Sequence, residues 1–150
     1  MNGYLLDVNV LIALTWPTHV HHAAARHWFD RNAASGWATC PVTQLGFVRV
    51  SSNPKIIRDA MAPREAVAML EQLFELPGHR FWTDEIAVTS VEPFASPGFV
   101  EHRQMTDAYL LALAQQHDGK LTTLDKGVAE LIAEHEQRAR WVELIPIASV

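Results

Sequence analysis

Two aspartates stand where short apolar segments give way to turns. Asp7 follows the apolar run at residues 4–6, and Asp125 follows the run at residues 121–124 and precedes Gly127. Ligands of open α/β sheets bind at the carboxyl ends of the strands. If both runs are neighbouring strands, the two carboxylates emerge at the same edge of the sheet.

Asp107 reaches that edge from a predicted helix. Leu110, Leu111 and Ala114 follow it at three, four and seven residues, which places its carboxylate on the apolar face. No Lys or Arg stands one helical turn away on that face. Carboxylates gathered without cations destabilise a fold, whereas Mg²⁺ and Mn²⁺ bind oxygen ligands of this kind. Such an ion activates water and stabilises a phosphoryl group under attack, so the three acids indicate metal-assisted hydrolysis.

Each acid also has a purely structural interpretation. Asp7 can cap the helix that follows it, Asp107 can complement a helix dipole, and Asp125 can form a turn before Gly127. For one acid alone this interpretation is the better one. The three together at one edge favour the metal site.

The elements that must position these residues alternate between strand and helix. Short apolar runs predict strands at 4–6, 37–40, 80–82 and 121–124, with a last apolar run at 141–147. Apolar spacing and Pro, Gly and Ser stops predict helices at 10–14, 19–34 (with Thr18 as N-cap), 43–50, 63–76, 106–117 and 126–135. Residues 90–98 are the most loop-like stretch and are too short for a domain linker. This alternation predicts one domain over residues 1–150, with a parallel sheet covered by helices on both faces.

Composition agrees with one compact domain. The chain has 150 residues, of which 49% are apolar. Its 12 basic and 17 acidic residues give a formal charge of −5, which argues against binding of nucleic acid by net positive charge alone. The single cysteine, Cys40, cannot form an intramolecular disulfide, so we expect a reducing cytoplasm. No targeting segment or membrane anchor is expected.

Three histidines near the first predicted helix invite a metal interpretation of their own. His19 and His22 are three residues apart, and His21 lies between them. No Cys or carboxylate completes a zinc set nearby, so a surface or groove role is favoured.

Several of these segments resemble one known family. Residues 5–12 (LLDVNVLI) resemble the opening motif of PIN domains, and residues 106–114 and 121–127 resemble their later acidic motifs. The separation of 18 residues between Asp107 and Asp125 fits compact members. Residues 41–54, with the early Trp-Pro and His-His pairs, are similar to the VapC-type toxins common in mycobacteria. The resemblance covers nearly the whole chain.

The resemblance implies a fold, an activity and a set of site residues. The fold is a three-layer α/β/α arrangement around a mainly parallel sheet of about five strands. The activity is that of a Mg²⁺- or Mn²⁺-dependent endoribonuclease, the toxin of a toxin–antitoxin pair. The matching metal-binding and catalytic acids are Asp7, Asp107 and Asp125, and the polar residues that flank them are Asn9 and Thr123. The resemblance also implies a homodimer and a VapB-type antitoxin that brings an Arg to the acids.

One residue departs from the family pattern. Gln44 stands where many PIN domains have a Glu. A neutral amide accepts a hydrogen bond but adds no charge, so three acids and Gln44 should hold a metal less tightly than four acids. The site would then hold one metal ion rather than two, or it would bind metal with an affinity that depends on bound RNA phosphate.

RNA needs cations beyond the metal, and two are the preferred candidates. Arg49 and Lys126 lie close in sequence to site elements. Two other functions stay open. A PIN-like RNA-binding module weakened by Gln44 is one. A Mg²⁺-dependent α/β phosphatase is the other, although Asn9 stands where such enzymes usually have a second Asp.

Overall fold

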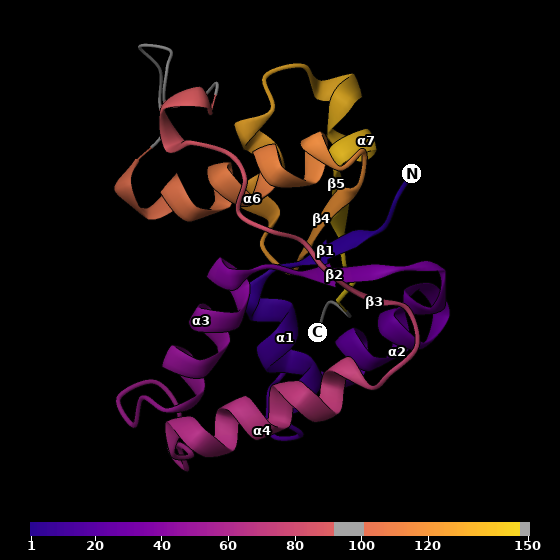
Figure 1. Ribbon diagram of the computed structural model, residues 1–150. Helices are drawn as coiled ribbons and strands as arrows, with labels where there is room; N and C mark the ends of the chain where they lie inside the picture. Colours follow the sequence, from indigo (N-terminus) through magenta and orange to yellow (C-terminus); the bar gives the residue numbers. More distant parts are fainter. Residues whose placement is uncertain (92–100, 148–150) are drawn as a thin grey trace.

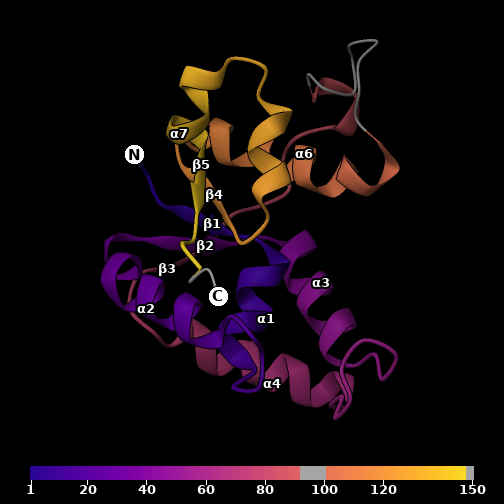
Figure 2. The same ribbon diagram turned by 180° about the vertical axis from the view of Figure 1, so that it is seen from behind.

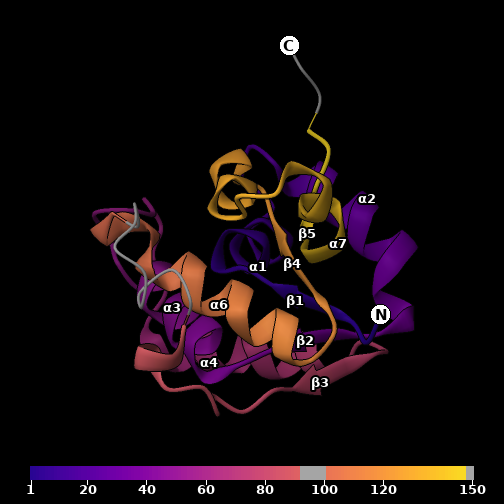
Figure 3. The ribbon, with the colours of Figure 1, turned by 90° about the horizontal axis from the view of Figure 1, so that it is seen from above.

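A parallel sheet forms the middle layer of the protein. The computed structural model describes residues 1–91 and 101–147. The five strands stand in the order β3-β2-β1-β4-β5 and every neighbouring pair is parallel. Figure 3 shows this order from above. The strands are β1 (Tyr4–Leu6), β2 (Trp37–Thr39), β3 (His79–Phe81), β4 (Lys120–Thr123) and β5 (Val142–Leu144). The predicted parallel sheet of about five strands is confirmed.

Helices cover both faces of this sheet (Figures 1 and 2). One face carries α1 (Val8–Thr15), α2 (His22–Asn32), α3 (Pro41–Ser51) and α4 (Pro63–Phe74). The other face carries α6 (Met105–Gln116) and the short α7 (Arg138–Trp141). Single 3-10 turns lie at Ala33–Ser35, Val88–Ser90, His102–Gln104 and His135–Gln137, and a longer one at Lys126–Leu131.

Successive side chains of a strand point to opposite faces, and this alternation builds two cores. Leu6 and Trp37 are fully buried on the side of α1 to α4, whereas Leu5 and Ala38 are fully buried on the side of α6. Because both faces are covered, the central strand needs no polar face and reads as an unbroken apolar run. That run stops at Asp7, where the chain leaves the sheet.

The prediction of a helix over residues 126–135 holds only for its first part, and there as a 3-10 helix at Lys126–Leu131. The segment begins as a 3-10 helix and ends at Ile132, whose backbone is extended (φ −95°, ψ 113°). Val128, Leu131 and Ile132 pack beside α6 in this compact form, and Arg138 Nε donates to the carbonyl of Ile132 at 2.9 Å. The sequence predicted helical winding here but not that the winding would be 3-10 or that it would stop at Ile132.

Two helix starts also differ from prediction. The helix expected from residue 19 begins at His22, with His21 rather than Thr18 at its N-cap. The helix expected from residue 43 begins at Pro41, a residue suited to the first helical position because it has no N–H to leave unpaired. Of the loop-like stretch at 90–98, residues 92–98 lie outside the described residues.

Close contact between α1 and α3 depends on Gly46. A Cβ added at Gly46 would lie 2.5 Å from Cγ2 of Val8, the first residue of α1. Real Cβ atoms do not approach other carbon atoms so closely, so a larger residue forces the two helices apart. Val8 follows Asp7 directly, so this contact also bears on the sheet edge where the acids lie.

We therefore predict that Gly46→Ala destabilises the protein by about 1–3 kcal/mol, through overpacking against Val8. Urea denaturation followed by circular dichroism measures the change. Val88→Ala is the control, because Val88 is 53% exposed and lies in neither helix. A Gly46→Ala protein as stable as the wild type contradicts the tight contact.

Candidate active site

Asp7 is a buried carboxylate held at the end of the central strand. Its residue is only 6% exposed. Oδ1 accepts from the backbone N–H of Val8 at 2.8 Å, which caps α1, and Oδ2 accepts from the Thr123 hydroxyl at 2.9 Å. Burial raises the pKa of Asp7, these two hydrogen bonds partly oppose the rise, and the charge of Asp125 adds to it.

The Thr123 hydroxyl joins the ends of β1 and β4. Besides donating to Asp7, Oγ1 accepts from Asn9 Nδ2 at 3.2 Å and from the backbone N–H of Asp125 at 3.1 Å. Asn9 Oδ1 in turn accepts from the backbone N–H of Leu124 at 3.2 Å. Both polar atoms of the Asn9 amide are therefore used to fasten α1 to the end of β4.

Asp107 lies in the first turn of α6, as its sequence spacing predicts. Its side chain is half-buried, and its pKa is raised to about 7. Burial is the largest cause, followed by the charges of Asp7 and then Asp125. The carboxylate thus lies within electrostatic reach of both other acids, which come from the ends of different strands.

Asp125 is the exposed member of the group. Its Oδ1 accepts from the backbone N–H of Gly127 at 2.8 Å, which starts the 3-10 helix. The structural roles proposed for single acids therefore hold: Asp7 caps a helix, Asp107 lies in the first turn of one, and Asp125 makes the turn. Each role leaves carboxylate lone pairs over, and a carboxylate accepts several partners at once.

The chemistry of this edge is set by uncompensated negative charge. Among residues 1–91 and 101–147, none of the ion pairs involves any of the three aspartates. Within the same residues, no three acidic, imidazole or thiol side chains come close enough to hold an ion by themselves. The acids are thus near enough to repel one another but too far apart to form a closed cage. Mg²⁺ keeps several waters and takes only one or two carboxylates directly, so an all-oxygen set of this kind fits it.

Gln44 is not joined to the aspartates by any contact in the described part of the chain. Its Nε2 donates to Thr39 Oγ1 at 3.1 Å, and Thr39 Oγ1 in turn lies 2.8 Å from His79 Nε2. His79 stacks on Phe74 of α4 with ring centroids 4.0 Å apart. The amide is held at the end of β2, the strand beside β1.

The two basic residues predicted for RNA contact lie on the surface. Arg49 is exposed near the end of α3, and Lys126 is exposed directly after Asp125. Neither takes part in an ion pair within the described ranges.

A hollow beside these residues was missed from the sequence. It runs along α1, and Asn9 belongs both to its wall and to the hydrogen-bond network of Asp7. Ile56 and Ile57 form part of it, although the segment around them reads as an ordinary loop. Two adjacent isoleucines in a loop were the available signal.

Comparison with known proteins places this arrangement in a family. The PIN domain model matches residues 4–134. The chain is 45% identical to Ribonuclease VapC38 of Mycobacterium tuberculosis over 143 residues, covering 95% of this chain and 98% of that protein. It is 44% identical to Ribonuclease VapC39 of the same organism over 126 residues, covering 84% and 91%.

A solved structure gives the same fold. The crystal structure of FitAcB from Neisseria gonorrhoeae matches with a TM-score of 0.60 at 20% identity, covering 93% of this chain and 96% of that one. The chain belongs to the PIN-domain family, and within it to the VapC-type branch. No helix in the described residues is long and apolar enough to span a membrane.

The Thr123 network makes a prediction about stability. Thr123→Val removes the donor to Asp7 and the acceptor for Asn9 and Asp125, so the buried Asp7 carboxylate loses a partner. We expect a loss of about 1–3 kcal/mol in urea denaturation at pH 7 with EDTA present, and a smaller loss for Thr123→Ser, which keeps the hydroxyl.

The neighbouring residue supplies the control. Thr122 is buried on the same strand, and its hydroxyl has no hydrogen-bond partner. Thr122→Val should therefore leave stability unchanged or raise it. If Thr123→Val and Thr122→Val lose the same amount of stability, the hydrogen bonds of Thr123 do not stabilise the protein as we expect.

Proposed function

We propose that this chain is a divalent-metal-dependent endoribonuclease that acts as the toxin of a toxin–antitoxin pair in the cytoplasm. The observation that carries the proposal is that Asp7, Asp107 and Asp125 lie close enough for their charges to interact, at the carboxyl ends of the strands of a PIN domain. The relatives that bear the name ribonuclease are 44–45% identical to this chain, which supports RNA as the substrate.

The three aspartates are the residues that would hold the metal and act in catalysis. A bound Mg²⁺ or Mn²⁺ supplies an activated water and offsets negative charge on the phosphate. Asp7 is oriented before any substrate arrives, since Thr123 and the Val8 N–H fix its two oxygens. Such preorganisation lowers the cost of reaching the reactive geometry.

Asp107 or Asp125 would take the proton of the attacking water, and Asp125 is the more accessible of the two. It is exposed, and its Oδ2 has no hydrogen-bond partner among the described residues. The water oxygen would then attack phosphorus in line, the opposite phosphorus–oxygen bond would break, and the leaving oxygen would take up a proton from solvent water. Asn9 and Thr123 hold the acids in place, and Gln44 at the end of the neighbouring strand is available to orient a water.

A weakened RNA-binding module is the second candidate, and Gln44 favours it. The residue carries no charge, and its described contacts run to Thr39 rather than to the acids. In that case RNA binds without being cut. An α/β phosphatase would instead hydrolyse a phosphomonoester. Assays with RNA and with a phosphomonoester therefore distinguish the ribonuclease, the binding module and the phosphatase.

Two protein partners are part of the proposal. An antitoxin of the VapB type would place an Arg on the three acids, which lack a cation of their own in the described chain. A second copy of the chain would cover the hollow between α3 and α4, where Leu45 is 68% and Val67 is 44% exposed. Exposed aliphatic residues gathered in a hollow are typical of contact surfaces.

Loss of one acid tests the catalytic assignment. We predict that Asp7→Asn and Asp107→Asn each lower Mg²⁺-dependent cleavage of single-stranded RNA at least about 100-fold, because each removes an anionic ligand. EDTA should abolish cleavage, and excess Mg²⁺ should restore it. Asp30→Asn is the matched control, since Asp30 lies on the surface of α2 in a weak ion pair with Arg26 at 3.8 Å. Wild-type cleavage by either site variant would refute the metal assignment.

Charge reversal tests the RNA surface. Arg49→Glu and Lys126→Glu should each weaken RNA binding and lower the slope of log affinity against log salt by about 0.7, the value for one lost contact to a single strand. Fluorescence anisotropy over a salt series measures both quantities. Arg31→Glu on α2 is the control, because Arg31 is exposed and belongs to a separate hollow. An unchanged slope excludes that residue from the interface.

A further inference from the structure

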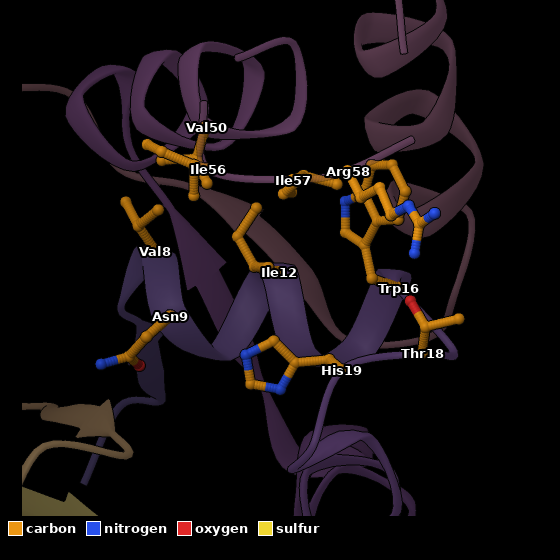
Figure 4. Close-up of a pocket in the computed structure, with 10 residues that line it drawn as sticks. All are labelled: Val8, Asn9, Ile12, Trp16, Thr18, His19, Val50, Ile56, Ile57 and Arg58. Atoms are coloured by element: carbon orange, nitrogen blue, oxygen red, sulfur yellow. The ribbon is translucent and has the colours of Figure 1, made fainter. Parts of the chain in front are cut away.

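A hollow of about 520 Å³ runs along α1 beside the acids. Figure 4 shows its walls: Val8 and Ile12 project from α1 toward Val50, Ile56 and Ile57. Its volume lies in the range of ligand pockets. Four polar residues complete the lining together with Trp16; they are Asn9, Thr18, His19 and Arg58.

The hollow begins where the carboxylate site ends. Asn9 lines it and also donates to Thr123, the residue that holds Asp7. From there it follows α1 to Trp16 and Thr18, past the end of the helix. The eight-residue helix α1 is about 12 Å long. An RNA chain bound at the acids would therefore reach the hollow within one or two nucleotides.

Its walls are apolar, and Ile56 leaves them open to solvent on one side. Ile56 is 61% exposed, although it faces Val8 and Ile12 across the hollow. Trp16 is held in place by a hydrogen bond from its indole N–H to Ser51 Oγ at 3.2 Å. A fixed indole beside aliphatic side chains suits the flat face of an aromatic ligand.

Its rim carries hydrogen-bonding groups and positive charge. Arg58 is exposed at one end, and none of the ten lining residues is acidic, although the whole chain carries a formal charge of −5. His19 Nδ1 accepts from the backbone N–H of His21 at 3.0 Å, which leaves Nε2 as the ring donor. Asn9 and Thr18 add further polar atoms. An apolar slot with a cationic rim complements a base joined to a phosphate.

We propose that the hollow along α1 receives one unstacked nucleobase of the RNA substrate, next to the bond that is cut, with Arg58 on the adjoining phosphate. This inference rests on the proposed ribonuclease function, and it assigns to the residues of the hollow the choice of base next to the cut. Proteins read single-stranded RNA by accepting splayed bases against aromatic and apolar side chains. Arg58 would also pair with a carboxylate of a protein segment, so antitoxin binding is the competing outcome of the test; the short distance from the acids favours RNA.

Cleavage of a pool of random 12-nucleotide RNAs tests the proposal. Sequencing of the products should show that the wild type prefers certain bases at one position next to the cut. Ile56→Ala and Arg58→Ala should flatten the preference at that position alone and raise KM roughly threefold to tenfold, with kcat near the wild type. Both residues are exposed, so the variants should fold. Val88→Ala and Arg31→Ala, which alter exposed residues outside the hollow, should change neither quantity.

A second measurement keeps this inference separate from the proposed function. Titration with the four ribonucleoside 5′-monophosphates, followed by NMR of the Trp16 indole N–H, reports binding without cleavage. An uncut pool with Mg²⁺ present counts against the ribonuclease, whereas a nucleotide-dependent shift of Trp16 that Arg58→Ala removes still supports the base site.

Three results overturn the inference. One is an RNA pool cut with no base preference at all. Another is an unchanged preference in both hollow variants. The third is normal RNA kinetics with weakened binding of the antitoxin, which would assign the hollow to a protein segment.

Discussion

The burial of the Asp7 carboxylate constrains the rest of this structure. A charged group that is 6% exposed must be paired or hydrogen-bonded, and here its donors come from opposite ends of the chain. Val8 gives a backbone N–H from the next residue, and Thr123 gives a hydroxyl from 116 residues away. The sheet order follows the same requirement, since β1 and β4 must be neighbours for Thr123 to reach Asp7.

Stability and function pull in different directions at this edge. The hydrogen bonds stabilise the charged form of Asp7, while its burial and the charge of Asp125 raise the cost of keeping it charged. The pKa of Asp107 is raised to about 7 for the same reasons, burial first and like charge second. A fold selected for stability alone would place a cation among these acids. A bound cation would relieve the repulsion between these carboxylates, so their closeness favours binding of an ion.

The sequence predicted what local pattern controls and missed what distant segments decide together. Asp7 and Asp125 stand out in the sequence because an apolar run ending in a carboxylate is visible in a few residues. The three uses of the Thr123 hydroxyl were not, because Asn9 reaches it from 114 residues away. The helix predicted over residues 126–135 is shorter than expected: a 3-10 helix packs beside α6 and gives way to extended backbone at Ile132. The hollow along α1 is lined by both Ile12 and Ile56. These residues are far apart in the sequence, so no local pattern reveals that they face each other.

The order of the strands has a consequence for synthesis of the protein. The central strand β1 is made well before its partner β4, which spans Lys120–Thr123. While the intervening residues are being made, Asp7 has neither Thr123 nor Asp125 beside it. Contacts so distant in sequence form late. The acidic edge can therefore assemble only after the segment that carries Thr123 and Asp125 has been made and has paired with β1.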